Sequence, residues 1–296
     1  MIDTRDERLF IDATIERVEQ LIAKGIWEGI DVARSRAWYR QFQDRECELL
    51  GACLLDNLVY RSKQQVLALL KSAMTSSVLL GTEAADDLQI VRALQERKDP
   101  HTRLIPIISI EQPPTKSGTY MLRLLARSLG IRDKWMIWPE LLDSQPSSVS
   151  RLIMVDDFCG TGDQFTSFMS RKPLVDFLSQ RPDCQIVYVT AAAHTDGLQK
   201  IQHELPSICV VAGEILTKSH HFFDGSVLDQ YNSIALKTQL RDQYVMVCNA
   251  FGLGGRIGNY GYQDQALTYA FAHGTPNNTL PVFWYETDGW TPLLDR

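Results

Sequence analysis

The sequence has 296 residues, of which 45% are hydrophobic and 22% are charged, and its formal net charge is −6. These proportions are ordinary for a soluble globular protein with one large domain or two small ones. The negative charge excludes a basic surface over the whole protein for nucleic acid, although a local basic groove stays possible. No run approaches the roughly 18 apolar residues that a membrane span needs.

The N-terminal stretch MIDTRDERLF lacks the basic and then apolar layout of a signal peptide. The six cysteines form no CxxC pair and no dense framework. We therefore expect a cytoplasmic protein whose thiols are reduced.

Residues 1–98 are predicted to be a helical domain, because their apolar side chains recur at helical spacing and no proline occurs before Pro100. Within it, residues 54–70 are predicted to form two helices joined near Arg61, with Ser62 as the N-cap. This segment contains no motif that carries chemistry by itself. We expect it to serve as a lid, an oligomer surface or a partner-docking surface.

Residues 99–296 are predicted to form an α/β domain with a mostly parallel sheet flanked by helices, because apolar runs alternate there with helical segments. A weaker run, interrupted by Pro139, is predicted to be an edge strand. The predicted strands are Leu104–Ile110, Met136–Leu142 (the edge strand), Leu152–Val155, Gln185–Ala192, Ile208–Ala212 and Ala266–Ala272.

The stretch Arg151–Gln164, RLIMVDDFCGTGDQ, carries the clearest functional signal. Asp156 and Asp157 directly follow a predicted buried strand, and the small-residue turn Cys159–Gly162 leads to a helix predicted to begin near Asp163. The turn can aim successive backbone N–H groups into one space, as a phosphate requires. The two carboxylates suit the hydroxyls of a ribose, or a Mg²⁺ held through water. Together they predict a site for a sugar phosphate.

A second loop has a phosphate-binding layout, because Lys116, Ser117 and Gly118 lie between the predicted strand Leu104–Ile110 and a helix predicted from Thr119. The alternative is an ordinary surface loop. Ligands of parallel sheets bind beyond the carboxyl ends of the strands, so both loops are expected at the same edge.

The stretch Arg151–Gln164 resembles the phosphoribosyl pyrophosphate (PRPP) loop of the type I phosphoribosyltransferases. Asp156 and Asp157 match the acidic pair, which in that family holds the ribose hydroxyls. Thr161 and Gly162 match the second threonine and the glycine that cradle the 5-phosphate. The resemblance implies a phosphoribosyltransferase-like fold and a role for Mg²⁺.

Two positions depart from that family's pattern. Gly160 and Gln164 stand where the family has threonines, so two hydroxyl donors to the phosphate are absent. The early loop of the family binds pyrophosphate, and the resemblance assigns that role to Lys116, Ser117 and Gly118.

The C-terminal stretch 273–284, HGTPNNTLPVFW, resembles the ending of the phosphoribosyltransferase-like effector domains of bacterial conflict systems. This resemblance implies a toxin-type effector of an antiphage operon, for instance of the retron type. It implies protein or ribonucleoprotein partners from the same operon, such as a reverse transcriptase or a DNA-binding protein, and leaves a homo-oligomer open. Asn277, Asn278 and Thr279 could read a base, or they could satisfy the backbone of a structural turn.

The leading hypothesis is an effector that binds a nucleotide, an NAD-like ligand or PRPP with Mg²⁺ and acts at the anomeric carbon, by transfer or by cleavage of an N-glycoside. Asp156 and Asp157 would hold the ribose and the metal, and the backbone of Cys159–Asp163 with the Thr161 hydroxyl would hold the 5-phosphate. Lys116 would neutralise a leaving pyrophosphate. One alternative is a nucleobase salvage phosphoribosyltransferase, and another is a catalytically inactive nucleotide-binding module.

The histidines favour no metal site. His220 and His221 are adjacent and have no third ligand at a metal spacing, so a role in a loop or at a helix end is expected. His194 lies near a strand end, where a hydrogen-bonded loop histidine is the preferred interpretation.

Overall fold

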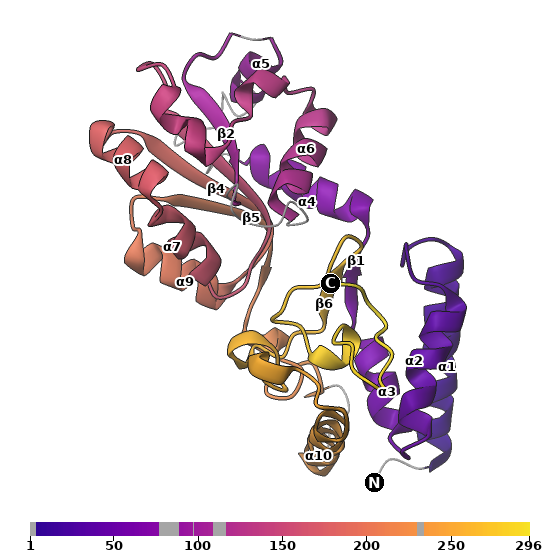
Figure 1. The fold of residues 1–296 in the computed structure, drawn as a ribbon. Coiled ribbons are helices and arrows are strands. Elements are labelled where there is room, and N and C mark those ends of the chain that lie inside the picture. The colour runs from indigo at the N-terminus through magenta and orange to yellow at the C-terminus, as the bar shows by residue number, and fades with distance from the viewer. Residues whose placement is uncertain (1–3, 77–88, 97, 109–116, 230–233) are drawn as a thin grey trace. The chain divides into compact units, whose positions relative to one another are not determined.

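The computed structural model describes residues 4–76, 89–96, 98–108, 117–229 and 234–296. The chain divides into two compact units (Figure 1). One unit combines Met1–Lys63 with Thr217–Arg296, and the other is Gln64–Leu216.

The unit Gln64–Leu216 is built on a four-stranded sheet whose order is β2-β3-β4-β5, with every neighbouring pair parallel. The strands lie in the order of the chain, so a helical crossover joins each strand to its neighbour. All four carboxyl ends therefore meet at one edge. The parallel α/β fold is confirmed, and the strands are β2 (Thr102–Pro106), β3 (Arg151–Cys159), β4 (Gln185–His194) and β5 (Cys209–Leu216).

Helices cover both faces of this sheet (Figure 1). On one face Phe165 stacks on Tyr188, with ring centroids 4.1 Å apart and planes 2° from parallel. On the other face Gly213 lets the backbone of α4 come close, since a Cβ there would lie 2.5 Å from the Leu69 carbonyl oxygen. The helices of this unit are α4 (Lys63–Met74), α5 (Gln89–Gln95), α6 (Ser117–Leu129), α7 (Asp163–Met169), α8 (Lys172–Gln180) and α9 (Thr195–Glu204).

The predicted edge strand Met136–Leu142 is wrong. Two 3-10 helices occupy this region, η2 (Asp133–Trp135) and η3 (Pro139–Ser144), and an isolated bridge joins Met136 to Leu104. Pro139 is at the start of η3, where its missing N–H costs nothing and its fixed φ favours a helical turn.

Strand β3 is longer than its apolar run. The prediction ended at Val155, whereas Asp156 still pairs with Thr190 of β4 and Cys159 with Ala193. The acidic pair is therefore inside the strand and does not follow it. The neighbouring strand, through its ladder of backbone hydrogen bonds, sets this length.

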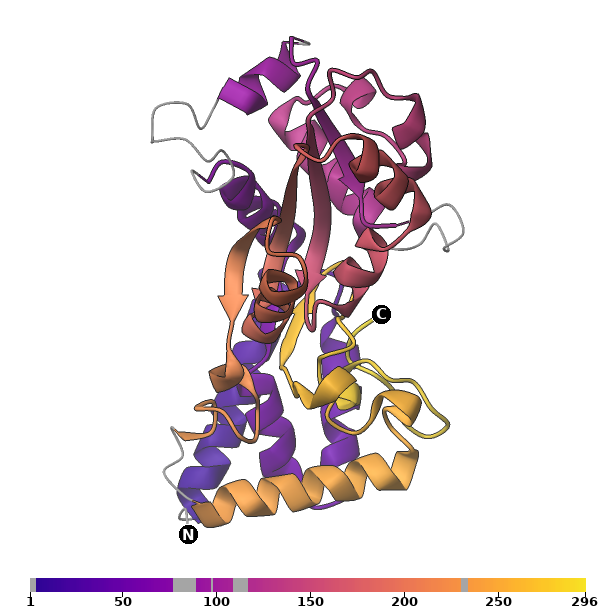
Figure 2. The same ribbon diagram turned by 90° about the vertical axis from the view of Figure 1, so that its left-hand side faces the viewer.

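The other unit combines N-terminal helices with the C-terminal third of the chain. Strand β1 (Val59–Arg61) pairs in parallel with β6 (Tyr269–Phe271), so it interrupts a segment that was predicted to be two helices. Figure 2 shows α10 as a long continuous helix. The remaining elements are α1 (Thr4–Ala23), α2 (Val32–Gln43), α3 (Glu48–Asp56), η4 (Lys218–His220), α10 (Ile234–Phe251), η6 (Gly255–Ile257), η7 (Tyr262–Asp264) and η8 (Pro281–Phe283).

Two buried tryptophans hold the C-terminal segment in the core of this unit. The indole nitrogens of Trp38 and Trp290 both donate to the Val282 carbonyl oxygen, at 2.8 and 3.0 Å. Trp38 also stacks on Phe283, with centroids 5.4 Å apart. A carbonyl oxygen has two lone pairs and can accept both bonds. Residues about 240 positions apart in the sequence thus share one core.

The predicted domains, 1–98 and 99–296, divide the chain differently from the compact units. The units describe packing and do not test which segments fold on their own, so the predicted division stays a prediction.

We expect Trp38→Phe to lower the free energy of unfolding by about 1–3 kcal/mol, because it removes a buried hydrogen bond and part of a buried ring. Trp138→Phe is the matched control, since Trp138 is 39% exposed. Denaturant titrations measure both variants. Equal stability of the two would contradict a central role for the Trp38 indole.

Candidate functional site

The predicted loop lies at the carboxyl edge of the sheet, between β3 and α7. Asp156 is only 2% exposed, and both of its carboxylate oxygens accept hydrogen bonds. One oxygen accepts from the Asp157 backbone N–H at 3.0 Å and the other from the Gln164 side-chain amide at 3.1 Å. Asp156 therefore ties the end of the strand to the first turn of α7.

Asp157 differs from its neighbour, because its side chain is only half-buried. The structure thus separates the two carboxylates that the sequence treats as a pair. Asp157 is the one that keeps contact with solvent and can meet a ligand, while Asp156 holds the backbone of Asp157 in place.

Two glycines, Gly162 in the loop and Gly197 in α9, let these two segments pack closely together. Gly162 has φ +81°, in the left-handed region that favours glycine, and a Cβ on it would lie 3.0 Å from the Gly197 carbonyl oxygen. A Cβ on Gly197 would lie 2.6 Å from the Gly160 carbonyl oxygen and 2.9 Å from Cys159 Sγ. The loop and the start of α9 can therefore make direct backbone contact. Our sequence analysis missed Gly197. A glycine so soon after the predicted strand Gln185–Ala192 could have indicated a close backbone contact there.

A lysine that the sequence analysis also missed reaches the loop from α9. Lys200 forms an ion pair with Asp163, the first residue of α7, and its Nζ lies 3.7 Å from Glu204. The hydrogen bond to Asp163 raises the pKa of Lys200. Thr161 Oγ1 donates to the other Asp163 carboxylate oxygen at 2.9 Å.

Helix α7 begins at Asp163, as predicted, but it has only seven residues. So short a helix aligns few peptide dipoles, and its contribution to anion binding is small. A phosphate at this loop would have to be held by backbone N–H groups and side chains.

Cys159 lies beneath the loop and is 3% exposed. Burial, with the nearby charge of Asp156, raises the pKa of this thiol to about 12. At neutral pH the group is a thiol, so Cys159 packs the loop and is no nucleophile.

Ser117 and Gly118 begin α6, two residues before the predicted Thr119. A Cβ on Gly118 would lie 3.2 Å from the Ile107 backbone nitrogen, so the first turn of α6 sits against the end of β2. Because β2 and β3 are neighbours, this turn and the acidic pair share one edge of the sheet. Lys116 lies outside the described residues.

The histidines and the C-terminal turn have structural roles. His194 is buried, and its Nδ1 accepts the Asp196 backbone N–H at 3.2 Å, which caps α9. His221 Nδ1 accepts the Asp224 N–H at 2.9 Å. Asn278 is 4% exposed and donates to the Tyr262 carbonyl oxygen at 3.3 Å, while the fully buried Thr279 donates to that of Tyr269.

The donor set suits a magnesium ion that arrives with a ligand. Among the residues that the structure describes, no three His, Cys, Asp or Glu side chains form a group that could hold a metal. Mg²⁺ needs only one or two carboxylates when phosphates and waters fill its other positions. Asp157, which is half-buried, fits that role better than Asp156, which is 2% exposed.

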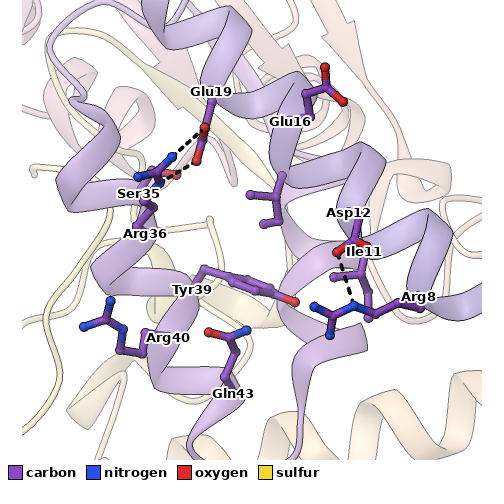
Figure 3. Close-up of a pocket in the computed structure, with 11 residues that line it drawn as sticks. Arg8, Ile11, Asp12, Glu16, Glu19, Ser35, Arg36, Tyr39, Arg40 and Gln43 are labelled. Carbon is purple, nitrogen blue, oxygen red and sulfur yellow. Dashed lines mark hydrogen bonds and ion pairs between the residues drawn. The ribbon is translucent and has the colours of Figure 1, made fainter.

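A pocket of about 400 Å³ lies between α1 and α2 (Figure 3). Three acidic and three basic side chains line it. Arg36 donates to both carboxylate oxygens of Glu19, at 2.6 and 2.9 Å, and Arg8 pairs with Asp12 at 3.2 Å. Its charges balance, so it has no preference for a phosphate.

The chain belongs to the PRTase-CE family, whose model matches residues 35–296. The match covers the whole unit Gln64–Leu216 and the other unit from within α2 onward, so it includes α3 and the C-terminal segment but not α1. Together with the parallel sheet flanked by helices, it identifies a phosphoribosyltransferase-like protein. Among the described residues, no helix is long and apolar enough to cross a membrane.

Two solved structures are similar to parts of the chain. The AQ2163 protein from Aquifex aeolicus is 11% identical, with 62% of this chain and 83% of that chain covered and a TM-score of 0.31. An orotate phosphoribosyltransferase from Aeropyrum pernix is 13% identical, with 52% and 80% covered and a TM-score of 0.26. The family match and the parallel sheet, and not these two similarities, identify the chain. No curated protein matches the chain.

We expect Gly197→Ala to destabilise the protein by about 1–3 kcal/mol, because the new methyl group would collide with the loop backbone. In an ordinary helix the same change stabilises by about 0.5–1 kcal/mol. Gly274→Ala is the control, since its Cβ would meet nothing within 4 Å. Thermal unfolding measures both, and a stabilised Gly197→Ala would refute the close contact.

We expect Cys159 to resist alkylation in the folded protein. Burial raises the pKa of this thiol to about 12, so very little thiolate is present near pH 8, and burial also slows access of the reagent. Iodoacetamide labelling followed by peptide mass spectrometry tests this, with the half-buried Cys209 as the internal comparison. Labelling of Cys159 at the rate of the unfolded chain would contradict the prediction.

Proposed function

We propose that the loop between β3 and α7 binds the ribose and 5-phosphate of a phosphoribosyl ligand, and that the chain acts at the anomeric carbon of this ligand. The observation that carries the proposal is the half-buried Asp157 beside a loop that Gly162 and Gly197 allow to pack directly on the start of α9. It occurs at the ligand-binding edge of a parallel sheet, in a member of the PRTase-CE family.

Each part of the site has a distinct role in this proposal. Asp157 accepts hydrogen bonds from the ribose hydroxyls, and Asp156 fixes the position of Asp157. The backbone of the loop between β3 and α7 binds the phosphate. Ser117 and Gly118 would bind a leaving pyrophosphate, and Asp157 would help to hold a Mg²⁺ that is also bound by the phosphates of the ligand.

The proposed reaction is a substitution at the anomeric carbon. The bond from this carbon to the leaving group breaks, the leaving group takes the electron pair, and an acceptor forms the new bond. The transition state of this substitution resembles an oxocarbenium ion. The Asp157 carboxylate stabilises its positive charge through the ribose hydroxyls. PRPP, a nucleotide and an NAD-like dinucleotide all present this carbon.

We also propose an effector role in antiphage defence, with protein or ribonucleoprotein partners from the same operon. Its support is the resemblance of the C-terminal segment to conflict-system effectors. A phage challenge of cells that carry the whole operon tests it, with Asp157→Asn as the variant. If cells with the Asp157→Asn operon were protected as well as cells with the wild-type operon, this would count against a role for this site in defence.

One observation favours a binding module without chemistry. The Thr161 hydroxyl, which in the resembling family donates to the phosphate, here donates to Asp163. Gly160 and Gln164 offer no hydroxyl in its place. Incubation of the purified protein with PRPP, NAD and nucleotides separates the two functions, since turnover favours the enzyme and saturable binding alone favours the module.

We expect Asp157→Asn to weaken PRPP binding at least about tenfold without lowering stability, because charged hydrogen bonds contribute about 1.5–3 kcal/mol each. Gly162→Val should abolish binding, since a β-branched residue fits neither the left-handed backbone nor the contact with Gly197. Calorimetric titration with PRPP and Mg²⁺ measures both.

Asp183→Asn is the control, because Asp183 is an exposed carboxylate of the same unit. We expect even the wild type to bind PRPP weakly, since two hydroxyl contacts are missing. Wild-type affinity in Asp157→Asn would remove this residue from the ribose site.

A further inference from the structure

The phosphate loop contains its own carboxylate. Asp163 is the first residue after Gly162. One of its carboxylate oxygens accepts a hydrogen bond from the Thr161 hydroxyl, and the other forms an ion pair with the Lys200 ammonium. The side chains of Lys200 and Asp163 are 34% and 28% exposed, so solvent and ligands can reach the pair. A negative charge at this point opposes the binding of a phosphate.

The donors that contact Asp163 are the ones that a phosphate needs. A threonine hydroxyl has one proton and donates to one acceptor at a time. An ammonium group forms strong charge-assisted hydrogen bonds with carboxylates and phosphates alike. The Asp163 carboxylate thus has the chemistry of a ligand phosphate oxygen and competes for the same donors.

We propose that Lys200 is a phosphate-binding residue, which Asp163 engages until the 5-phosphate of a ligand takes over the Lys200 ammonium and the Thr161 hydroxyl. This inference rests on the proposed function of the loop. It adds a cationic ligand from α9, in addition to the backbone N–H groups of the loop.

The surroundings of the loop explain why a lysine is needed. Gly160 has no side chain to donate, and the Gln164 amide is engaged with Asp156. Three carboxylates, those of Asp156, Asp157 and Asp163, lie in the loop or next to it and oppose the approach of a phosphate. Lys200 offsets one of these charges and supplies a donor.

A purely structural ion pair would have a different signature. If Lys200 and Asp163 only fastened α9 to the loop, removal of either partner would loosen the loop and weaken phosphate binding. If Asp163 competes with the phosphate, its neutralisation must strengthen binding. The two single variants therefore change affinity in the same direction under one model and in opposite directions under the other.

The experiment is calorimetric titration with ribose 5-phosphate, and separately with PRPP and Mg²⁺, on the full chain. We expect Asp163→Asn to bind at least threefold more tightly than the wild type and Lys200→Met at least tenfold more weakly. Lys200→Arg keeps the charge and should stay within a fewfold of the wild type. The double variant Asp163→Asn with Lys200→Met should recover part of the loss, because the uncompensated carboxylate is gone.

Two controls change charge by the same amount outside the proposed contacts. Asp183→Asn removes an exposed carboxylate of the same unit. Lys172→Met removes an ion-paired lysine of the same unit, whose partner is Asp176. Both should bind within about twofold of the wild type, and thermal unfolding checks that each variant is folded.

The outcomes separate this inference from the proposed function. If the wild type binds and Gly162→Val does not, but Asp163→Asn weakens binding as Lys200→Met does, the ion pair is structural and the inference is overturned while the function stands. If the wild type and Asp163→Asn both fail to bind either probe, the proposed function fails and the inference fails with it. Tighter binding by Asp163→Asn together with weaker binding by Lys200→Met supports both.

Discussion

The backbone contact between Gly162 and Gly197 is the constraint on which the candidate site depends. No side chain fits between the loop and the start of α9, so α9 comes close enough for Lys200 to reach Asp163. The same contact closes the loop over Cys159 and keeps this thiol buried. A site that needs several backbone N–H groups aimed at one point requires such a fixed loop, because an adaptable one would lose entropy when it binds.

The second feature of the site is the unequal environment of its two carboxylates. Asp156 is buried and fully engaged, and it links the strand to α7 through Gln164. Asp157 keeps its contact with solvent. A glutamine reaches far enough for this link where a threonine would not. The departure from the phosphoribosyltransferase pattern at position 164 therefore exchanges a phosphate donor for a support of the acidic pair.

The C-terminal stretch that resembles conflict-system effectors is part of a core. Val282 accepts hydrogen bonds from Trp38 and Trp290, and Asn278 and Thr279 bond to neighbouring backbone carbonyls. Buried polar groups with such partners stabilise one packing arrangement and leave little for a ligand. The family match, residues 35–296, covers this stretch and also Trp38, whose indole holds Val282 in the core.

The sequence alone determined what depends on neighbours in the chain. Apolar runs marked β2, β3, β4 and β5, and the order of acidic pair, glycine turn and helix start marked the loop, because strand propensity and turn chemistry are local. Tertiary structure decided the rest. The pairing of β1 with β6, the extension of β3 past Val155, and the approach of Gly197 and Lys200 all join residues far apart in sequence. Local patterns contain no record of such partners, because hydrogen-bond ladders and ion pairs form only when packing brings both sides together.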